Sequence, residues 1–310
     1  MKKLSCEAFA RAETYIMAHA RKVDKARYEF VFRGGHRQEV TLALARYQNE
    51  DGGFGHGLEP DVRADASSAI ATATGLAILR EVGAGESEVV VQRAVAYLLR
   101  TFDHAHYVWP IVPPEVEQAP HAPWWSHADS AQNFGHFLAN PRAALVGHLY
   151  HYQALVPPDF LTPLAEATIA HLQALPDEME MHDLLCYVDL ASADHVPDGL
   201  RRRVIDKLLC AVPVTVVTDP ARWGGYGLMP LDVAPSPDSP FGQALPSPAI
   251  QANLDLLIDS QLADGSWPLT WSWAQIDPSA WTRAELGWKG YLAVNKLRSL
   301  AAYGRLENKT

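Results

Sequence analysis

The sequence contains few cysteines. Only Cys6, Cys186 and Cys210 occur among 310 residues, widely spaced and without a CxxC pair. An odd number at such spacing excludes a disulfide framework and favours the reduced thiols of a cytoplasmic protein. We therefore expect a cytoplasmic location.

Long apolar runs and basic runs are also absent. No stretch approaches the length of a membrane span, so no transmembrane segment is expected. The balance of 26 basic against 36 acidic residues gives a formal charge of −10. Because no part of the chain is strongly basic, nucleic acid is excluded as a main partner.

The usual signatures of nucleotide and hydrolase sites are missing too, namely the nucleophile elbow, the phosphate-binding glycine loop and the dinucleotide fingerprint. What the sequence does contain is a hydrophobic content of 48% with a helical period. Val40, Ala43, Leu44 and Tyr47, for example, follow one helix face. The sequence predicts an all-α fold in one domain over residues 1–310.

Ten helices are predicted, and their consecutive pairs suggest stacked hairpins. Their ranges are 5–24, 36–49, 66–82, 87–101, 141–155, 160–174, 179–192, 198–210, 247–262 and 280–303. Residues 212–219 are expected to be extended. Residues 103–139 and 213–246 are expected to form two long, ordered, aromatic-rich loops over one end of the helical body.

A short motif occurs twice, as "YQNEDGGFG" at 47–55 and "SQLADGSWP" at 260–268. Each copy follows an apolar helical stripe, and Gly52 and Gly265 are expected in left-handed turns that end a helix. The other shared positions are expected to bond the turn or pack over the junction: Gln48, Gln261, Asp51, Asp264, Phe54 and Trp267.

These two stretches, "LARYQNEDGGFG" and "LLIDSQLADGSWP", resemble the Gln-Trp repeats of the terpenoid cyclase and protein prenyltransferase superfamily. "NPRAALVGHLY" and "GWKGYLAVNKLRSLAAYGRL" extend the resemblance to bacterial prenyltransferase-like proteins of similar length. The resemblance implies an α/α-toroid of five to six helical hairpins with an apolar or isoprenoid-like substrate in a central cavity. The Asp-x-Asp-Asp string that protonates substrate in class II terpene cyclases is absent.

The resemblance also raises the question of zinc, which protein prenyltransferases hold with Asp, Cys and His. Here His182, Asp183 and Cys186 stand at a different spacing, although positions 182 and 186 share a helix face. A histidine beside a buried thiol is the favoured interpretation, so no cofactor is expected and zinc is the alternative.

The best candidate for chemistry is the acidic stretch after the first motif. It contains His56, Glu59, Asp61, Arg63 and Asp65. Crowded carboxyl groups beside an arginine can leave one of them protonated, and we expect Asp61 or Asp65 to be the general acid. The alternative is a surface loop in which Asp65 caps the next helix and Arg63 pairs with Glu59 or Asp61.

Aromatic side chains supply the candidate substrate-binding residues, because their faces stabilise a carbocation or stack on a sugar ring. They are, with one histidine, Trp124, Trp125, His127, Trp223, Tyr226, Trp267 and Trp271. Trp281 and Trp288 are assigned to ordinary core packing. The leading prediction is acid-initiated chemistry on an apolar substrate. A carbohydrate-active toroid enzyme and a non-catalytic helical-hairpin scaffold remain as alternatives.

Overall fold

The computed structural model describes residues 1–307 and confirms the all-α prediction, since this part of the chain forms no strand beyond isolated bridges. The α-helices are α1 Cys6–His19, α2 Lys22–Phe32, α3 Arg37–Leu44, α4 Ala69–Glu81, α5 Val89–Thr101, α6 His127–Asn133, α7 Arg142–His151, α8 Pro158–Ala174, α9 Met181–Ala191, α10 Asp198–Thr215, α11 Pro230–Val233, α12 Ser247–Asp259 and α13 Pro278–Ala302. None of them is long and apolar enough to cross a membrane.

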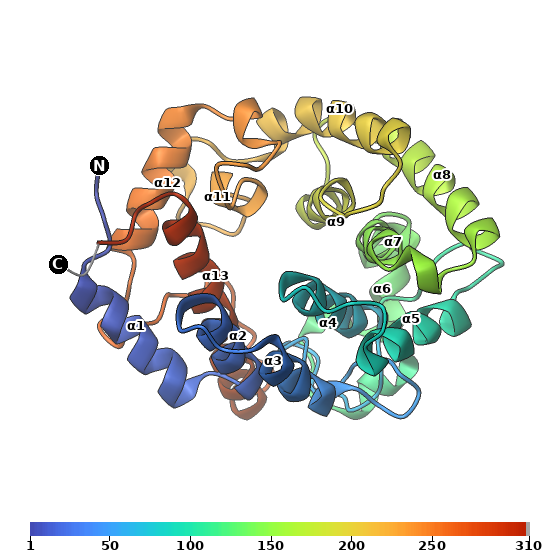
Figure 1. Cartoon of the computed structure of the whole chain (residues 1–310), viewed down its shortest axis with the longest axis horizontal. Coiled ribbons are helices and arrows are strands. Elements are labelled where there is room, and N and C mark those ends of the chain that lie inside the picture. Colours follow the sequence, from blue (N-terminus) through green and yellow to red (C-terminus); the bar gives the residue numbers. More distant parts are fainter. Residues whose placement is uncertain (308–310) are drawn as a thin grey trace.

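The helices follow one another around a ring in which α4, α7, α9, α11 and α13 lie inside α1, α5, α8, α10 and α12 (Figure 1). Leu4 and Leu306 lie side by side where the ring closes. There α1 packs on α13, and the backbone N–H of Leu4 donates to the carbonyl of Arg305 at 2.7 Å. Closure therefore joins the first helix to the last.

Burial along each helix explains its layer. The outer helix α5 buries one face, through Val90, Val91, Ala94, Val95 and Leu98. The inner helix α7 buries every residue from Arg142 to Tyr150, because α4, α8 and α9 all pack on it. A helix covered on several sides loses the amphipathic period that marks an outer helix.

The predicted helix 5–24 is instead parts of two helices, because α1 ends at His19 and α2 begins at Lys22. The chain breaks at Ala20, and a separate helix, α2, follows. Sequence periodicity missed α2 because two of its buried residues are charged. Asp24 and Arg27 are both within 1% of full burial, where they pair with each other and with Arg21 and Glu81.

Other boundaries also differ from the predictions. α10 continues to Thr215, so the first half of the expected extended segment 212–219 is helical. α4 is capped by the Ser68 hydroxyl, which accepts from the N–H of Ala71, rather than by Asp65. The stretches 103–139 and 213–246 contain α6, α11 and the short 3-10 helices Pro114–Gln118, Pro123–Trp125, Gly135–Phe137, Pro220–Arg222 and Gly242–Ala244.

The repeated motif has the predicted geometry in both copies. Gly52 and Gly265 both have φ of +91°, and a β-carbon on either would lie 2.3 Å from a carbonyl oxygen of the neighbouring outer helix. The Gln48 amide donates to the carbonyls of Gly52 and Val90. Gln261 repeats this pattern with Gly265 and Ala8, so each motif fastens a junction to the next outer helix.

Candidate functional site

The acidic stretch divides into a buried part and an exposed part. Glu59 and Asp61 are only 6% and 2% exposed, whereas the side chain of Asp65 is 87% exposed and accepts from His56. The surface-loop interpretation is therefore wrong for Glu59 and Asp61. Within residues 1–307, Arg63 forms no ion pair with either of them.

Asp61 is held by two tryptophans that follow it by about two-thirds of the chain. The indole Nε1 of Trp273 donates to Oδ1 at 2.7 Å, and that of Trp271 donates to Oδ2 at 3.2 Å. The pKa of this carboxyl is raised above its ordinary value, because the effect of burial exceeds the lowering by the indole hydrogen bonds. Because both oxygens accept hydrogen bonds, the geometry suits the ionised form.

Glu59, unlike Asp61, accepts no short hydrogen bond within residues 1–307. Its burial, together with the negative charge of Asp61, raises its pKa from 4.5 to about 8. The nearest polar contact is long, 3.5 Å from the backbone N–H of Asp61 to Oε1. Glu59 is therefore a neutral carboxylic acid at pH 7, beside a charged partner.

Trp271, which donates to Asp61, is one of three aromatic rings that contact one another. The rings of Trp271 and Trp288 meet edge to face at 5.2 Å, and Tyr226 meets Trp271 in the same way at 6.0 Å. Trp288 was assigned to the core from sequence, yet it is half-buried and belongs to this aromatic series. The helical spacing of Trp281 and Trp288 concealed this, because both fall on one long helix, α13.

A hydrogen-bonded chain follows Tyr226. Its hydroxyl lies 3.0 Å from Nε2 of His182, and Nδ1 of His182 lies 2.7 Å from Oε1 of Glu180. The neighbouring Asp183 has its pKa raised to about 6 by burial and by Glu180. Glu180 and His182 begin α9, and neither was among the residues predicted to line the site.

The residues considered for the alternative zinc site do not converge. Both ring nitrogens of His182 already have partners, and burial raises the pKa of the Cys186 thiol. No group of three or more His, Cys, Asp or Glu side chains in the described part of the chain is arranged to hold a metal ion.

Apart from the exposed Trp124, the other predicted binding residues lie in the packing between elements. Trp267 is buried and donates to the carbonyl of Leu257, and Trp223 donates to that of Val217. Trp125 stacks on Phe134 at 5.0 Å within the buried cluster that includes Trp273. His127 contacts the carbonyl of Val112, whereas Trp124 is exposed.

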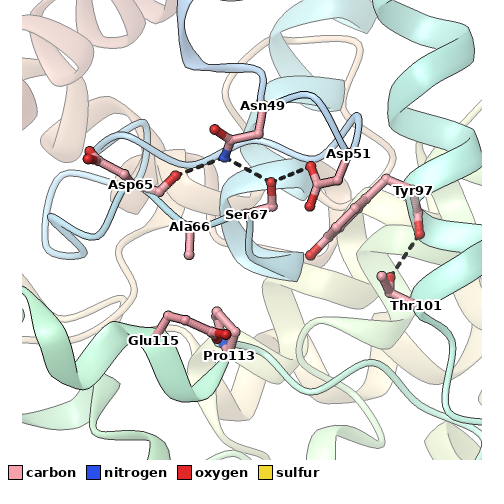
Figure 2. Close-up of a pocket in the computed structure, with 9 residues that line it drawn as sticks. All are labelled: Asn49, Asp51, Asp65, Ala66, Ser67, Tyr97, Thr101, Pro113 and Glu115. Carbon is pink, nitrogen blue, oxygen red and sulfur yellow. Dashed lines mark hydrogen bonds between the residues drawn. The ribbon is translucent and has the colours of Figure 1, made fainter.

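A surface pocket of about 510 Å³ lies on the exposed side of the acidic stretch (Figure 2). Asp65 lines it together with Asn49, Asp51, Ser67, Tyr97, Thr101, Pro113 and Glu115. The Asn49 amide donates to the Asp65 carbonyl and to Ser67, whose hydroxyl donates to Asp51. These hydrogen bonds support the turn of the first motif. Glu59 and Asp61 do not line the pocket.

Comparison with known proteins adds nothing to this geometry. No protein-family model matches the sequence, and no curated protein matches it.

Proposed function

We propose that this chain is an enzyme that uses Glu59 as a general acid on an apolar, isoprenoid-like substrate. The observation that supports this is the buried neutral carboxyl of Glu59 beside Asp61, whose two oxygens accept the indole N–H groups of Trp271 and Trp273. Two neighbouring carboxyl groups, one protonated and one ionised, are the usual arrangement for an acid and its charged partner.

The roles follow from the protonation states. Glu59 transfers its proton from the carboxyl oxygen to a carbon of a substrate double bond, and the resulting carbocation forms beside the Asp61 carboxylate. Water-poor surroundings strengthen this electrostatic stabilisation. Asp65, which the sequence offered as an alternative acid, is exposed to solvent and lacks such surroundings.

The neighbouring aromatic side chains meet a second requirement of this reaction, which is stabilisation of the carbocation. Trp271 meets both Trp288 and Tyr226 edge to face, so that the ring faces point in different directions. Such faces attract a cation without reacting with it. The ring of helices in Figure 1 and the repeated motif agree with an α/α-toroid, the fold that the resemblance implies.

The test is proton transfer from solvent. The protein is incubated in D₂O with squalene, farnesol and a cellular lipid extract, and the products are analysed by mass spectrometry for one added deuterium. We expect labelled product from the wild type and a loss of about 100-fold or more in Glu59→Gln. Glu50→Gln, at an exposed glutamate nearby, is the control. Equal labelling by Glu59→Gln, or no labelling by the wild type, contradicts the proposal.

A carbohydrate substrate is the second candidate, and it is favoured by the chain of Glu180, His182 and Tyr226. These groups can bind sugar hydroxyls while Trp271 stacks on the ring. A thermal-shift screen with oligosaccharides distinguishes the two candidates. Stabilisation of the wild type that is lost in both Tyr226→Phe and Trp271→Ala favours the sugar.

A further inference from the structure

A second pocket, of about 360 Å³, lies between the end of α7 and the starts of α8 and α10. Its lining residues are Tyr150, Gln153, Val156, Pro158, Leu161, Thr162, Glu166, Pro197 and Leu200. In the ring, α8 and α10 are neighbouring outer helices and α7 lies inside α8 (Figure 1), and α8 packs on both of them. The pocket therefore belongs to a different part of the fold from the acid site around Glu59 and Asp61.

The first turns of α8 supply one wall of this pocket. The contributing residues follow one another at helical spacing on one side of the helix, and they are Pro158, Leu161, Thr162 and Glu166. Proline fixes its own φ, so Pro158 at the first position of α8 and Pro197 at the N-cap of α10 restrain the backbone. The two helix starts that border the pocket are therefore stiff.

The pocket has a buried, mainly apolar floor and an exposed rim. The buried side chains are Tyr150, Val156, Leu161 and Leu200. The exposed ones are Gln153, Pro158, Thr162, Glu166 and Pro197. A largely apolar cavity with a few polar groups is the usual form of a small-molecule site. Its volume of about 360 Å³ has room for roughly a dozen water-sized groups.

The hydroxyl of Tyr150 is left without a partner in this floor. The residue is only 4% exposed, and no group within residues 1–307 forms a hydrogen bond with its hydroxyl. A buried hydroxyl without a partner is unfavourable, and most such groups in folded proteins are bonded. Burial, followed by the charge of Glu166, raises the pKa of this phenol, so it keeps its proton. Tyr150 therefore offers a hydrogen-bond donor that lacks an acceptor.

The charge of the lining limits which acceptor can enter. Among the described lining residues, Glu166 is the charged one, and its Oε2 accepts from Nη1 of Arg203 at 2.7 Å. A ligand carboxylate would be repelled by Glu166, and a ligand ammonium has no lone pair with which to accept from Tyr150. A neutral hydroxyl group accepts from Tyr150 and still has a proton to donate to the rim, where Glu166 and Gln153 carry acceptors.

We infer that this pocket binds a small neutral molecule that carries a hydroxyl group on an apolar body. Tyr150 donates to the hydroxyl oxygen, while Leu161 and Leu200 contact the apolar body. The site is separate from the proposed acid chemistry and is judged by binding alone. It therefore stands or falls independently of the role of Glu59.

The experiment is an NMR titration of the full chain, labelled at its leucine and valine methyl groups, with phenylethanol and with octanol. We expect saturable shift changes at Val156, Leu161 and Leu200. Tyr150→Phe should weaken binding about three- to tenfold, because one hydrogen bond is lost. Tyr152→Phe is the matched control, since Tyr152 is also buried with an unpartnered hydroxyl within residues 1–307 but does not line the pocket.

Three further probes test the chemistry of the ligand. Ethylbenzene, phenylacetate and phenylethylammonium keep the aromatic body of phenylethanol and change its polar group. We expect phenylethanol to bind more tightly than each of them. Tighter binding of any of the three overturns the inference, as does the absence of saturable shift changes with both alcohols. Binding that is unchanged in Tyr150→Phe, or equally weakened in Tyr152→Phe, overturns it too.

Thermal unfolding without ligand separates a binding role of the hydroxyl from a structural one. Because Tyr150→Phe removes a buried hydroxyl that has no partner, its unfolding midpoint should equal or exceed that of the wild type. A clear fall in this midpoint would show that the Tyr150 hydroxyl is bonded within the fold, and the inference would fail.

Discussion

Trp273 donates its indole N–H to Oδ1 of Asp61 at 2.7 Å, although 212 residues separate the two positions. Both side chains are buried. The bond joins the loop after the first motif to the segment after the second. It therefore links the contact between these two segments to the charge state of Asp61.

Asp61→Asn should destabilise the protein by about 1–3 kcal/mol. Asparagine offers one oxygen where the carboxylate offers two, so one of the two indole N–H groups loses its acceptor. Chemical denaturation followed by tryptophan fluorescence measures the change. Asp65→Asn, at an exposed side chain on the same loop, should stay within about 0.5 kcal/mol of the wild type; equal losses in both variants would contradict the prediction.

The pH dependence of stability should reveal Glu59. Its pKa in the folded protein is about 8, above the ordinary value of 4.5, so the folded state keeps a proton that the unfolded chain releases between these values. The stability it contributes is complete below pH 4.5 and declines as the pH rises to 8. Relative to Glu59→Gln, the wild type should lose about 2 kcal/mol between pH 5.5 and pH 7.5. Parallel stability curves for the two proteins would show that Glu59 titrates normally.

Gly52→Ala and Gly265→Ala should each cost roughly 2–3 kcal/mol, because alanine adds left-handed strain and a contact with a backbone carbonyl. Each β-carbon would lie 2.3 Å from such an oxygen, in Arg93 and Arg11 respectively. The double variant should lose the sum of the two costs, since the sites lie in separate junctions. Gly224→Ala is the control, because a β-carbon at this glycine would meet no atom within 4 Å. Thermal and urea unfolding provide both comparisons.

Asp24→Asn should lower the free energy of unfolding by about 3–5 kcal/mol, since it leaves Arg21 and Arg27 without a carboxylate that is fully buried between them. Asp259→Asn breaks the exposed pair with Lys2 and should cost no more than about 1 kcal/mol. Similar losses for the two variants, measured by urea denaturation, would show that the buried pair is not special.

The sequence predicted most helices of both layers but missed α2 as a separate helix. An outer helix such as α5 has an apolar stripe that the sequence reveals. In α2, by contrast, two of the buried residues are Asp24 and Arg27, whose charges are paired only in the folded protein. The repeated motif was predicted closely because its turn chemistry is local: a glycine with positive φ, an aspartate that caps the turn and a glutamine that reaches the next helix. Pairing of charges between distant helices leaves no periodic signal.

The candidate site was predicted in part. The acidic stretch was found from the sequence, but its division into a buried pair and exposed Asp65 depends on Trp271 and Trp273 far along the chain. Glu180 was missed, and His182 was considered only as a possible zinc ligand, because nothing near them in sequence pairs them with Tyr226. A general acid is set by burial and neighbours, and these are properties of the fold.

The protonation state of Glu59 tests the central claim most directly. Infrared difference spectroscopy between the wild type and Glu59→Gln, recorded as a function of pH, isolates the carboxyl band of this one residue. The structure predicts a protonated carboxyl band at pH 7 that disappears with an apparent pKa of about 8. A band that disappears near pH 4.5 would show an ordinary surface-like glutamate and would contradict the assignment of Glu59 as the acid.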